Sequence, residues 1–368
     1  MKIRSIGWTA ALGVLLAAGT AAAAAGDLLQ GRVHDMSREN RPLTEKWKDA
    51  ARSARSGQDG DLFFTGHVFL SRHGIRRGEK WDRPRDYMVE AASGRIRLRR
   101  GTRSERGSSW SMESEGEGPA GILLLHRLSG TGSDVVDVHM INLEDGHVFE
   151  KTPVYWMGEA ETSDSLDCLT SVFEGSGERL RDRLVFLIGS HSDPRAGEFL
   201  FRTALGESSF KVRKSAVFWI GNLRNQQSLP FLQDIYKEAR DSGLREQVVF
   251  ALHICDDERA PAEMLGIARG ADSRKVRKSA IFWLGQKVSE ESIGFLREVV
   301  DSDENDDLKD AAVFAISQLP RERSVPLLID IARTNRSAAA RKKAIFWLGQ
   351  TGSPEALDFF EEILFKKD

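Results

Sequence analysis

Five histidines in the N-terminal half are the residues best suited to hold a metal ion, because imidazole nitrogens are common zinc ligands. They are His67, His73, His126, His139 and His147. Zinc sites favour close pairs such as His-x3-His, whereas the intervals here are 6, 53, 13 and 8 residues. We therefore assign no metal ligand, no catalytic residue and no cofactor. A metal-dependent enzyme is an alternative only if the fold brings three of these side chains together.

Alternating arginines offer a second kind of chemistry. Arg95, Arg97 and Arg99 fall on every second residue, with Arg100 beside them, in a basic segment covering residues 72–106. Alternate side chains of a strand lie on one face, so three guanidinium groups would stand together and could bind phosphate or carboxylate. We expect these four arginines to bind an anion, and an anionic polymer of the cell envelope is one candidate. Docking on an acidic surface of the same chain and a solvated charged hairpin are the alternatives.

The C-terminal half repeats itself every 32 residues, and this repeat must position any functional side chain that it carries. A phenylalanine recurs at this interval, at Phe186, Phe218, Phe250, Phe282, Phe314 and Phe346. Self-similarity at a fixed period of this length is typical of a solenoid, in which each unit buries its apolar face against its neighbours. Apolar residues on nearly every side of the Phe predict a first helix packed between adjacent units.

A second helix is marked by its start and by a face of acidic and aromatic side chains. Seven positions after the Phe, five of the six units have a residue that can cap a helix, namely Asp193, Asn225, Asp257, Ser289 and Ser353. Opposite the apolar stripe of this helix lie Phe231, Phe295, Phe359, Asp234, Glu298, Asp330 and Glu362. Apolar groups beside charge suit a protein-binding groove, so we expect this row to line the concave surface and to bind a partner. The alternative is a solvated helix face with its aromatic rings tucked between layers.

A second period, of 64 residues, is superposed on the first. In alternate units the Phe is followed by Trp219, Trp283 and Trp347. In the same units it is preceded, by four positions, by Lys214, Lys278 and Lys342. Large side chains beside small ones fit interdigitated packing between layers, and lysines that alternate with acids could form an ion-pair ladder. We interpret both patterns as structural.

Residues 272–286 resemble the first helix of a short HEAT repeat of the phycobilin-lyase (PBS-lyase) type. The resemblance lies in Val276-Arg277, Ala280 and Leu284-Gly285. It covers roughly residues 178–368 and is strongest around Phe218, Phe282 and Phe346. The likeness implies an α-solenoid, and as a whole the chain is similar to exported bacterial HEAT-repeat proteins. It lends little support to bilin chemistry.

Upstream of the repeats, the hydrophobic period becomes that of strands. Short apolar runs separated by turn signals predict a small, mainly antiparallel β domain of roughly six to eight strands over residues 61–160. Residues 26–60 are predicted to be a polar segment with one amphipathic helix near Leu43 to Ser56, and a helix within residues 163–177 to cap the first repeat. The predicted fold class is multidomain α+β. The β domain is followed by an α-solenoid of six 32-residue HEAT-like helix pairs over residues 178–368.

The first 25 residues have the pattern of a secretory signal peptide. Lys2 and Arg4 precede a weakly apolar stretch and an alanine run that ends before Gly26. The stretch is shorter than a membrane-spanning helix, so we expect cleavage, and we expect no membrane span after it. Export permits disulfides, but Cys168 and Cys255 lie nearly three repeats apart and are predicted to be buried thiols. The protein is expected to be periplasmic or extracellular.

Together these patterns favour an exported, non-catalytic scaffold that recognises a protein partner along the second-helix face. The formal net charge of −2 gives no sign of nucleic-acid binding. The rival interpretation is an enzyme or enzyme subunit with a metal-dependent site in the histidine-containing β domain.

Overall fold

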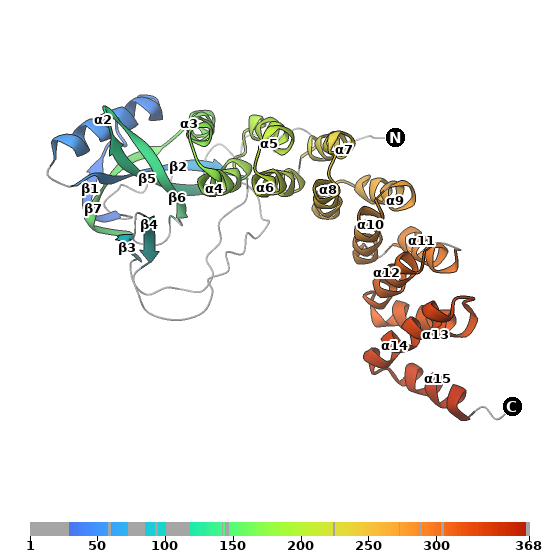
Figure 1. Cartoon of the computed structure of the whole chain (residues 1–368). Coiled ribbons are helices and arrows are strands. Elements are labelled where there is room, and N and C mark those ends of the chain that lie inside the picture. Colours follow the sequence, from blue (N-terminus) through green and yellow to red (C-terminus); the bar gives the residue numbers. More distant parts are fainter. Residues whose placement is uncertain are drawn as a thin grey trace, which may run out of the picture. The chain divides into compact units, whose positions relative to one another are not determined.

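A computed structural model places the chain in two units, Met1–Ala196 and Gly197–Asp368 (Figure 1). The residues that it describes are 29–57, 60–72, 85–92, 95–100, 118–141, 143, 147–223, 225–271, 273–287, 289–302 and 305–365. Within 85–92 and 95–100 it describes the backbone alone. None of the helices in this described part of the chain combines the length and the apolar character that crossing a bilayer requires.

The first unit is built around a seven-stranded sheet. Its strands are β1 (Leu29–Asp35), β2 (Leu62–Ser71), β3 (Arg85–Ala92), β4 (Arg95–Arg100), β5 (Gly118–Ser129), β6 (Gly132–Ile141) and β7 (His147–Glu159). Their order in the sheet is β4-β3-β7-β2-β5-β6, and β1 also pairs with β7. The strand-rich domain that the sequence predicts is therefore present, followed by the run of helices that completes the α+β fold class.

The sheet is mixed, which corrects the expectation of a mainly antiparallel one. The hairpin pairs β3–β4 and β5–β6 and the pair β2–β5 are antiparallel, but β1, β2 and β3 all run parallel to β7. Turn residues in the sequence identify hairpins, which are antiparallel by construction. They do not reveal that the last strand returns to the middle of the sheet and pairs with strands far away in the sequence.

β1 also corrects the expected domain boundary at residue 61. The helix expected near Leu43 to Ser56 forms as α2 (Leu43–Ser56). Residues 26–60 are nevertheless part of the sheet domain, because Leu29–Asp35 pairs with β7. Only Leu29 of this strand is buried, so the apolar alternation that identifies a strand is missing from its sequence.

The two faces of the sheet carry separate apolar cores. Alternation along β2 sends Phe63 and Phe64 to opposite faces, and both side chains are fully buried. Phe64 belongs to a cluster with Trp156 of β7. Phe63 belongs to a cluster with residues of α2 and with Cys168 of α3 (Thr162–Glu174). α3 in turn packs against α4, the first helix of the first repeat, where the sequence predicts a cap.

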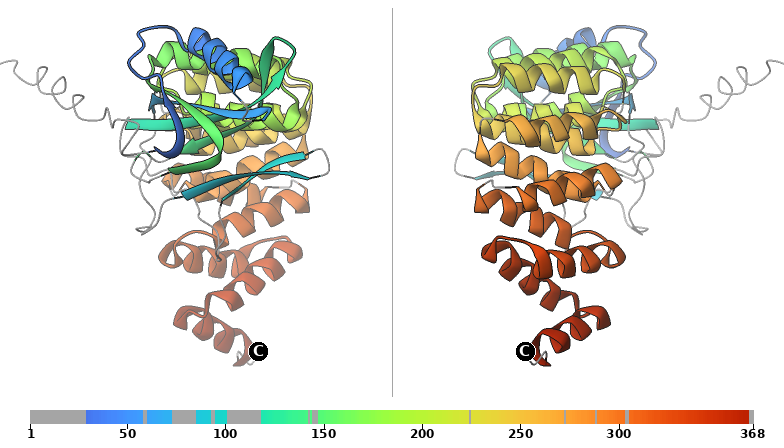
Figure 2. Two further views of the ribbon diagram at one scale, coloured as in Figure 1. Left: turned by 90° about the vertical axis from the view of Figure 1, so that its left-hand side faces the viewer. Right: turned by 90° about the vertical axis from the view of Figure 1, so that its right-hand side faces the viewer.

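The repeats form helix pairs as predicted. The first helices are α4 (Glu178–Gly189), α6 (Phe210–Gly221), α8 (Ser242–Ile254), α10 (Arg274–Gln286), α12 (Asp306–Ser317) and α14 (Ala338–Thr351). The second helices are α5 (Arg195–Gly206), α7 (Ser228–Glu238), α9 (Ala260–Gly270), α11 (Glu290–Asp301), α13 (Arg321–Thr334) and α15 (Pro354–Phe365). Figure 2 shows the pairs of the C-terminal unit stacked as successive layers.

Local hydrogen bonds explain why each second helix begins where it does. The Oδ1 atoms of Asp193, Asn225 and Asp257 accept a hydrogen bond from the backbone N–H two residues further on, at 2.9, 3.0 and 2.9 Å. Ser289 and Ser353 accept through Oγ from the N–H three residues further on, each at 3.1 Å. All five predicted capping residues therefore accept a hydrogen bond at a helix start, where backbone N–H groups otherwise have no partner.

A second recurrent contact closes the helix that precedes each first helix. Arginine side chains donate to a backbone carbonyl at the end of that helix, over 2.7–3.1 Å, from Arg181, Arg213, Arg245, Arg277 and Arg341. The last carbonyls of a helix carry partial negative charge and have no acceptor role within the helix, so a guanidinium there is stabilising. The invariant basic position of the repeat is therefore explained by architecture.

Within the C-terminal unit, the first helices lie on the inner side of the curve. α6, α8, α10, α12 and α14 each pack on the next, whereas successive second helices contact each other much less. In a curved stack, the row that is packed more closely lies inside, and Figure 1 shows the first helices there. The second helices form the outer, convex row. This reverses the expected positions of the two rows.

Candidate functional site

A buried serine lies between two histidines in the first unit. Nε2 of His67 on β2 lies 2.8 Å from Oγ of Ser165 on α3, and Nε2 of His191, just after α4, lies 2.9 Å from the same oxygen. All three side chains are fully buried. Histidine beside serine is the arrangement of an activated nucleophile, but full burial closes this serine to any substrate.

Hydrogen-bond partners fix the direction of this relay. Nδ1 of His191 lies 2.7 Å from the carbonyl oxygen of Leu187, which can only accept, so Nδ1 carries the proton and Nε2 accepts from Ser165. Ser165 then accepts from Nε2–H of His67, whose buried Nδ1 has no partner among the described residues. Burial lowers the pKa of His67 to about 3 and that of His191 to about 4. The relay is a neutral link between β2, α3 and the end of α4.

His126 is also fully engaged in the core. Its Nε2 lies 2.8 Å from Oγ1 of Thr65 and its Nδ1 lies 3.3 Å from Oγ of Ser133. The ring stacks on Phe63 with centroids 4.8 Å apart. Burial lowers the pKa of His126 to about 3, so the ring is neutral at physiological pH.

The other three histidines do not complete a metal site in the described part of the chain. Nε2 of His139 lies 3.3 Å from the carboxylate of Asp137, which also pairs with Arg183. His147 is fully buried, and His73 lies outside the described residues. Within the residues that the structure describes, no three His, Cys, Asp or Glu side chains gather so that they could share a metal ion.

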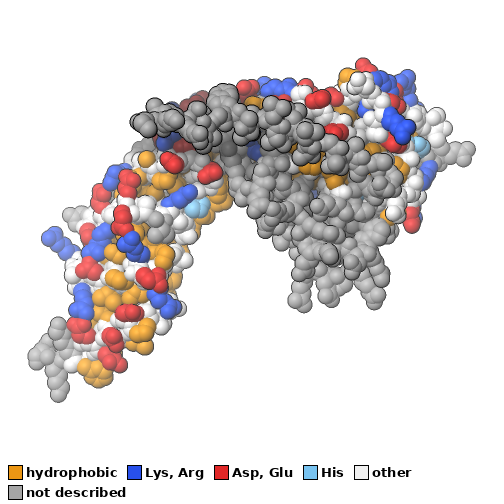
Figure 3. Space-filling view, turned by 180° about the vertical axis from the view of Figure 1, so that it is seen from behind, with side chains coloured by type: hydrophobic (Ala, Val, Ile, Leu, Met, Phe, Trp, Pro, Cys, Tyr) orange, Lys and Arg blue, Asp and Glu red, His pale blue; other side chains and the backbone are white. Residues whose placement is uncertain are grey.

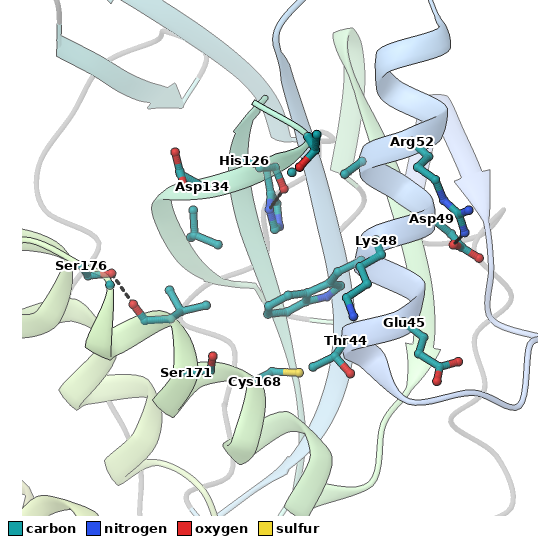
Figure 4. Close-up of a pocket in the computed structure, with 18 of the residues that line it drawn as sticks. Thr44, Glu45, Lys48, Asp49, Arg52, His126, Asp134, Cys168, Ser171 and Ser176 are labelled. Carbon is teal, nitrogen blue, oxygen red and sulfur yellow. Dashed lines mark hydrogen bonds and ion pairs between the residues drawn. The ribbon is translucent and has the colours of Figure 1, made fainter. Parts of the chain in front are cut away.

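A cavity of about 860 Å³ opens in the first unit between α2, the β5–β6 hairpin and α3 (Figure 4). His126 and Cys168 lie in its wall, together with Trp47. Burial raises the pKa of the Cys168 thiol to about 12, so the thiol stays protonated at neutral pH. The described lining therefore contains neither a reactive thiolate nor a histidine that takes up a proton near neutral pH.

The predicted arginine site falls on β4. Its register against β3 places Arg95, Arg97 and Arg99 opposite Ala92, Glu90 and Met88. Since alternate residues of a strand share a face, the three arginines occupy one face and Arg100 the other. The strand expected for this site is therefore present, and anion binding by it stays a prediction.

The acidic residues expected to bind a partner are each paired with a basic residue of the chain itself. Asp234 lies 3.2 Å from Nζ of Lys237, and Glu298 lies 3.1 Å from Arg269. Asp330 and Glu362 pair in the same way, with Arg297 and Arg333. These pairs mostly join successive second helices, so they are contacts between layers of the repeat.

The aromatic residues of the same row are mostly buried. Phe295 and Phe359 are 4% and 3% exposed, each beneath a guanidinium 5.3 Å from its ring centre. Phe231 is half-buried and stacks on Phe201. The expectation that Phe295 and Phe359 line an open groove is therefore wrong. An arginine of the preceding layer covers each ring and also binds the nearby acid, which the sequence pattern alone does not reveal.

A row of aromatic rings on the first helices forms a different surface, which we call the aromatic ladder. Its members are Phe218, Phe250, Phe282, Trp283, Phe314, Phe346 and Trp347. Ring centroids that neighbour each other along the row lie between 4.8 and 6.0 Å apart, within the range of favourable ring contacts. The contacts run through five successive helices, from α6 to α14, and make one continuous surface.

The ladder is accessible along its whole length. All seven rings are at least partly exposed, and Phe346 is 54% exposed. The residue directly before each Phe points inward instead, and Ile281 and Val313 are fully buried there. Figure 3 shows hydrophobic side chains running along the surface of the C-terminal unit among charged ones. Each first helix therefore has one apolar side for packing and a second one toward solvent.

Two polar atoms beside the ladder have no partner in the described structure. Nε1 of Trp347 is buried without an acceptor, and Nδ1 of His253 is buried without any hydrogen bond. The His253 ring stacks on Trp283, with centroids 4.6 Å apart. An unsatisfied buried polar atom costs about 1–3 kcal/mol, a cost that a bound ligand could remove.

Lysines adjoin the ladder in alternate repeats. Lys278 and Lys342 are exposed and make no ion pair within the described residues, and each lies four positions before a Phe of the ladder. The acids of the intervening repeats pair with other lysines, Glu246 with Lys275 at 2.8 Å and Asp310 with Lys343 at 3.1 Å. Residues four apart are neighbours on one helix face, so these two ammonium groups border the rings.

The sequence contains the signal for this surface, but it was read as packing. Tryptophan and lysine recur in the same alternate repeats and on the same side of the first helix. That coincidence indicates an outward face with mixed chemistry, since a packing position does not need a lysine beside it.

The family comparison now bears on the fold. The family model for HEAT repeats matches residues 261–344 and 293–368. The resemblance noted from residues 272–286 is thereby confirmed, and the C-terminal part of the chain carries HEAT repeats. A comparison with curated protein sequences finds no match to the chain.

Several solved structures share the helical repeat. Human deoxyhypusine hydroxylase in complex with glycerol is 17% identical, with 56% of this chain and 80% of that chain covered and a TM-score of 0.25. The complex of CpcE and CpcF of phycocyanin lyase from a Nostoc species is 16% identical, with 54% and 81% covered and a TM-score of 0.29. The YibA protein of E. coli is 18% identical, with 56% and 77% covered and a TM-score of 0.35. At these TM-scores the likenesses say nothing of function.

Proposed function

This chain is a HEAT-repeat scaffold, and from that premise we propose that it binds a protein partner along the aromatic ladder. We propose further that it is exported and that its role is binding rather than catalysis. The observation that carries the proposal is the ladder itself, a continuous and accessible row of rings bordered by unpaired lysines on the inner side of the curve. Inner surfaces of this kind are where α-solenoids hold extended partners.

The chemistry of the ladder indicates what the partner offers. Exposed rings and the apolar stems beside them favour leucine, methionine or aromatic side chains. Lys278 and Lys342 favour carboxylates at matching positions, and the unpaired Nε1–H of Trp347 favours a backbone carbonyl. We therefore expect an extended protein segment that combines apolar and acidic residues.

A capture experiment from an envelope extract tests this assignment. The bait is the purified protein, and the ladder variant carries Lys214→Glu and Lys278→Glu, two substitutions on the inner row. Reversing two charges beside the rings should repel an acidic segment and reduce capture at least tenfold. Both side chains reach the surface, so melting temperature and circular dichroism should match those of the unmodified protein.

The matched control reverses charges on the outer row. Its three substitutions are Asp234→Lys, Glu298→Lys and Asp330→Lys. We expect this variant to retain the partner that the ladder variant loses. Loss of the partner with the outer-row variant alone would overturn the ladder assignment in favour of the second-helix face. Equal capture by all three proteins would show that neither face binds the partner.

Export is a separate part of the proposal and rests on the N-terminal pattern. Cell fractionation should recover the protein from the periplasm or the medium, with its mature N-terminus near Gly26. Recovery in the cytoplasm with Met1 retained would contradict it.

The arginine face of β4 is proposed as an additional anionic contact. Reversal of Arg95, Arg97 and Arg99 to Glu should weaken binding to an anionic envelope polymer and flatten its dependence on salt. Binding that is unchanged in this variant and insensitive to salt would remove the arginines from the proposal.

A further inference from the structure

The last repeat leaves interior positions uncovered. The position just before the repeating Phe is fully buried at Val217, Val249, Ile281 and Val313, but Ile345 in α14 is 37% exposed. The same comparison applies in α15. Val325 is 3% exposed and its equivalent Leu357 is 59% exposed, whereas Ile331 is fully buried and its equivalent Ile363 is 46% exposed.

These exposed side chains are of the interior type rather than the capping type. A terminal repeat that ends a solenoid in water needs a polar outer face. Here isoleucine and leucine are kept at positions that pack between layers everywhere else, and Leu364 beside them is 77% exposed. We call Ile345, Leu357, Ile363 and Leu364 the open end. An apolar surface of this kind marks a site of association.

Charge on the two helices of the open end is segregated by sign. α14 carries Arg341, Lys342 and Lys343 and no acid, whereas α15 carries Glu355, Asp358, Glu361 and Glu362 and no base. Some of these groups have partners in the chain, as Lys343 has in Asp310 and Glu362 in Arg333. Lys342, Glu355, Asp358 and Glu361 are exposed and make no ion pair within the described residues.

We propose that two copies of this chain dock through their open ends about a two-fold axis. Such an axis places α14 of each copy on α15 of the other, so the basic helix meets the acidic one twice and the apolar positions meet at the centre. The surface is thus complementary to itself, which a second copy satisfies and an unrelated partner would have to match by chance.

Analytical ultracentrifugation of the purified protein at micromolar concentration tests this. We expect the unmodified chain to sediment as a dimer. The open-end variant Leu357→Asp with Leu364→Asp should be a monomer, with dimer affinity reduced at least a hundredfold and an unchanged melting temperature, since both side chains are largely exposed. The control Phe210→Asp replaces another exposed apolar residue, 42% exposed on α6, and should still dimerise.

A charge exchange tests the two-fold geometry. The acidic variant carries Lys342→Glu and Lys343→Glu, and the basic variant carries Asp358→Lys and Glu361→Lys. Each alone places like charges on both halves of the interface and should be a monomer, whereas a mixture should form a one-to-one dimer. A monomeric unmodified protein, a dimer that survives the open-end variant, or a mixture that stays monomeric would each overturn the proposal. None of these outcomes depends on whether the aromatic ladder binds a partner.

Discussion

Acid should unfold the first unit long before the second, because three neutral histidines are buried in the first. The pKa of His67 and His126 is lowered to about 3 and that of His191 to about 4, from the ordinary value of 6.5, chiefly by burial. Each ring is therefore neutral in the folded state at pH 5 and protonated in the unfolded state. Protons then bind preferentially to the unfolded chain, so the free energy of unfolding falls as the pH falls below 6.5.

The size of the effect follows from these values. Each histidine contributes about 1.4 kcal/mol per pH unit below 6.5, or about 2 kcal/mol between pH 6.5 and 5. Three independent rings would contribute about 6 kcal/mol, and coupling of His67 to His191 through Ser165 lowers the sum somewhat. This approaches the whole stability of a typical domain, about 5–15 kcal/mol. Stability is fully present above pH 6.5 and is lost between that pH and about 4.

The second unit is a built-in control. Its sequence contains one histidine, His253, which is only half-buried. Carboxylates do not confuse the measurement in this pH window, since the pKa values of Asp35, Asp137 and Asp193 are lowered below the ordinary value of 3.8. Hydrogen exchange read by mass spectrometry at pH 7, 6 and 5 separates the two units, with β2 and α3 reporting on one and α10 on the other.

Two substitutions assign the effect to particular rings. His126→Gln keeps a polar side chain in the core without a titrating ring, so the pH slope of the first unit should fall by about a third. The matched control His34→Gln changes an exposed histidine and should leave the slope as it is. Equal loss of protection in both units between pH 6.5 and 5, or NMR titration of these rings in the folded protein above pH 6, would refute the reasoning.

Three further predictions concern the packing of the repeats. In Gly285→Ala the new Cβ would lie 2.8 Å from the Cβ of Ala315, so α10 and α12 must separate and the free energy of unfolding should fall by about 1–3 kcal/mol in urea titrations. In Gly294→Ala, a helical glycine with nothing within 4 Å, it should instead rise by about 0.5–1 kcal/mol. Arg277→Met keeps the apolar stem but loses the 2.9 Å bond to the carbonyl of Ala268, which should cost about 1 kcal/mol. Unchanged unfolding midpoints would contradict all three.

Local chemistry carried the sequence interpretation of the repeats. The recurring Phe fixes the length of the repeat, and the capping residue seven positions later fixes the start of the second helix. Both depend on residues close in the chain, and the five capping bonds confirm them. α2 was predictable for the same reason, because one apolar stripe on a polar helix identifies it without tertiary information.

Long-range pairing was not predictable from the same patterns. β1 has one buried residue, so its place in the sheet depends on β7, which lies more than a hundred residues further along the chain. The curvature of the solenoid poses the same problem. Which helix row lies inside depends on how closely successive layers approach, and this is set by small residues such as Gly285 against Ala315. The sequence shows the small residue but not what it faces, and so the functional row was assigned to the wrong helices.

The alternation of the ladder has a consequence for the partner that the 32-residue period alone would not have. Lys278 and Lys342 are separated by two layers, and helices that pack directly lie about 8–10 Å apart, so the two ammonium groups are about 16–20 Å apart. An extended chain advances about 3.3 Å per residue, so carboxylates that reach both lysines must be about five or six residues apart. A helical partner would need them about eleven to thirteen residues apart, since it rises 1.5 Å per residue. The acidic spacing of whatever partner is captured therefore indicates whether it lies on the ladder as an extended segment or as a helix.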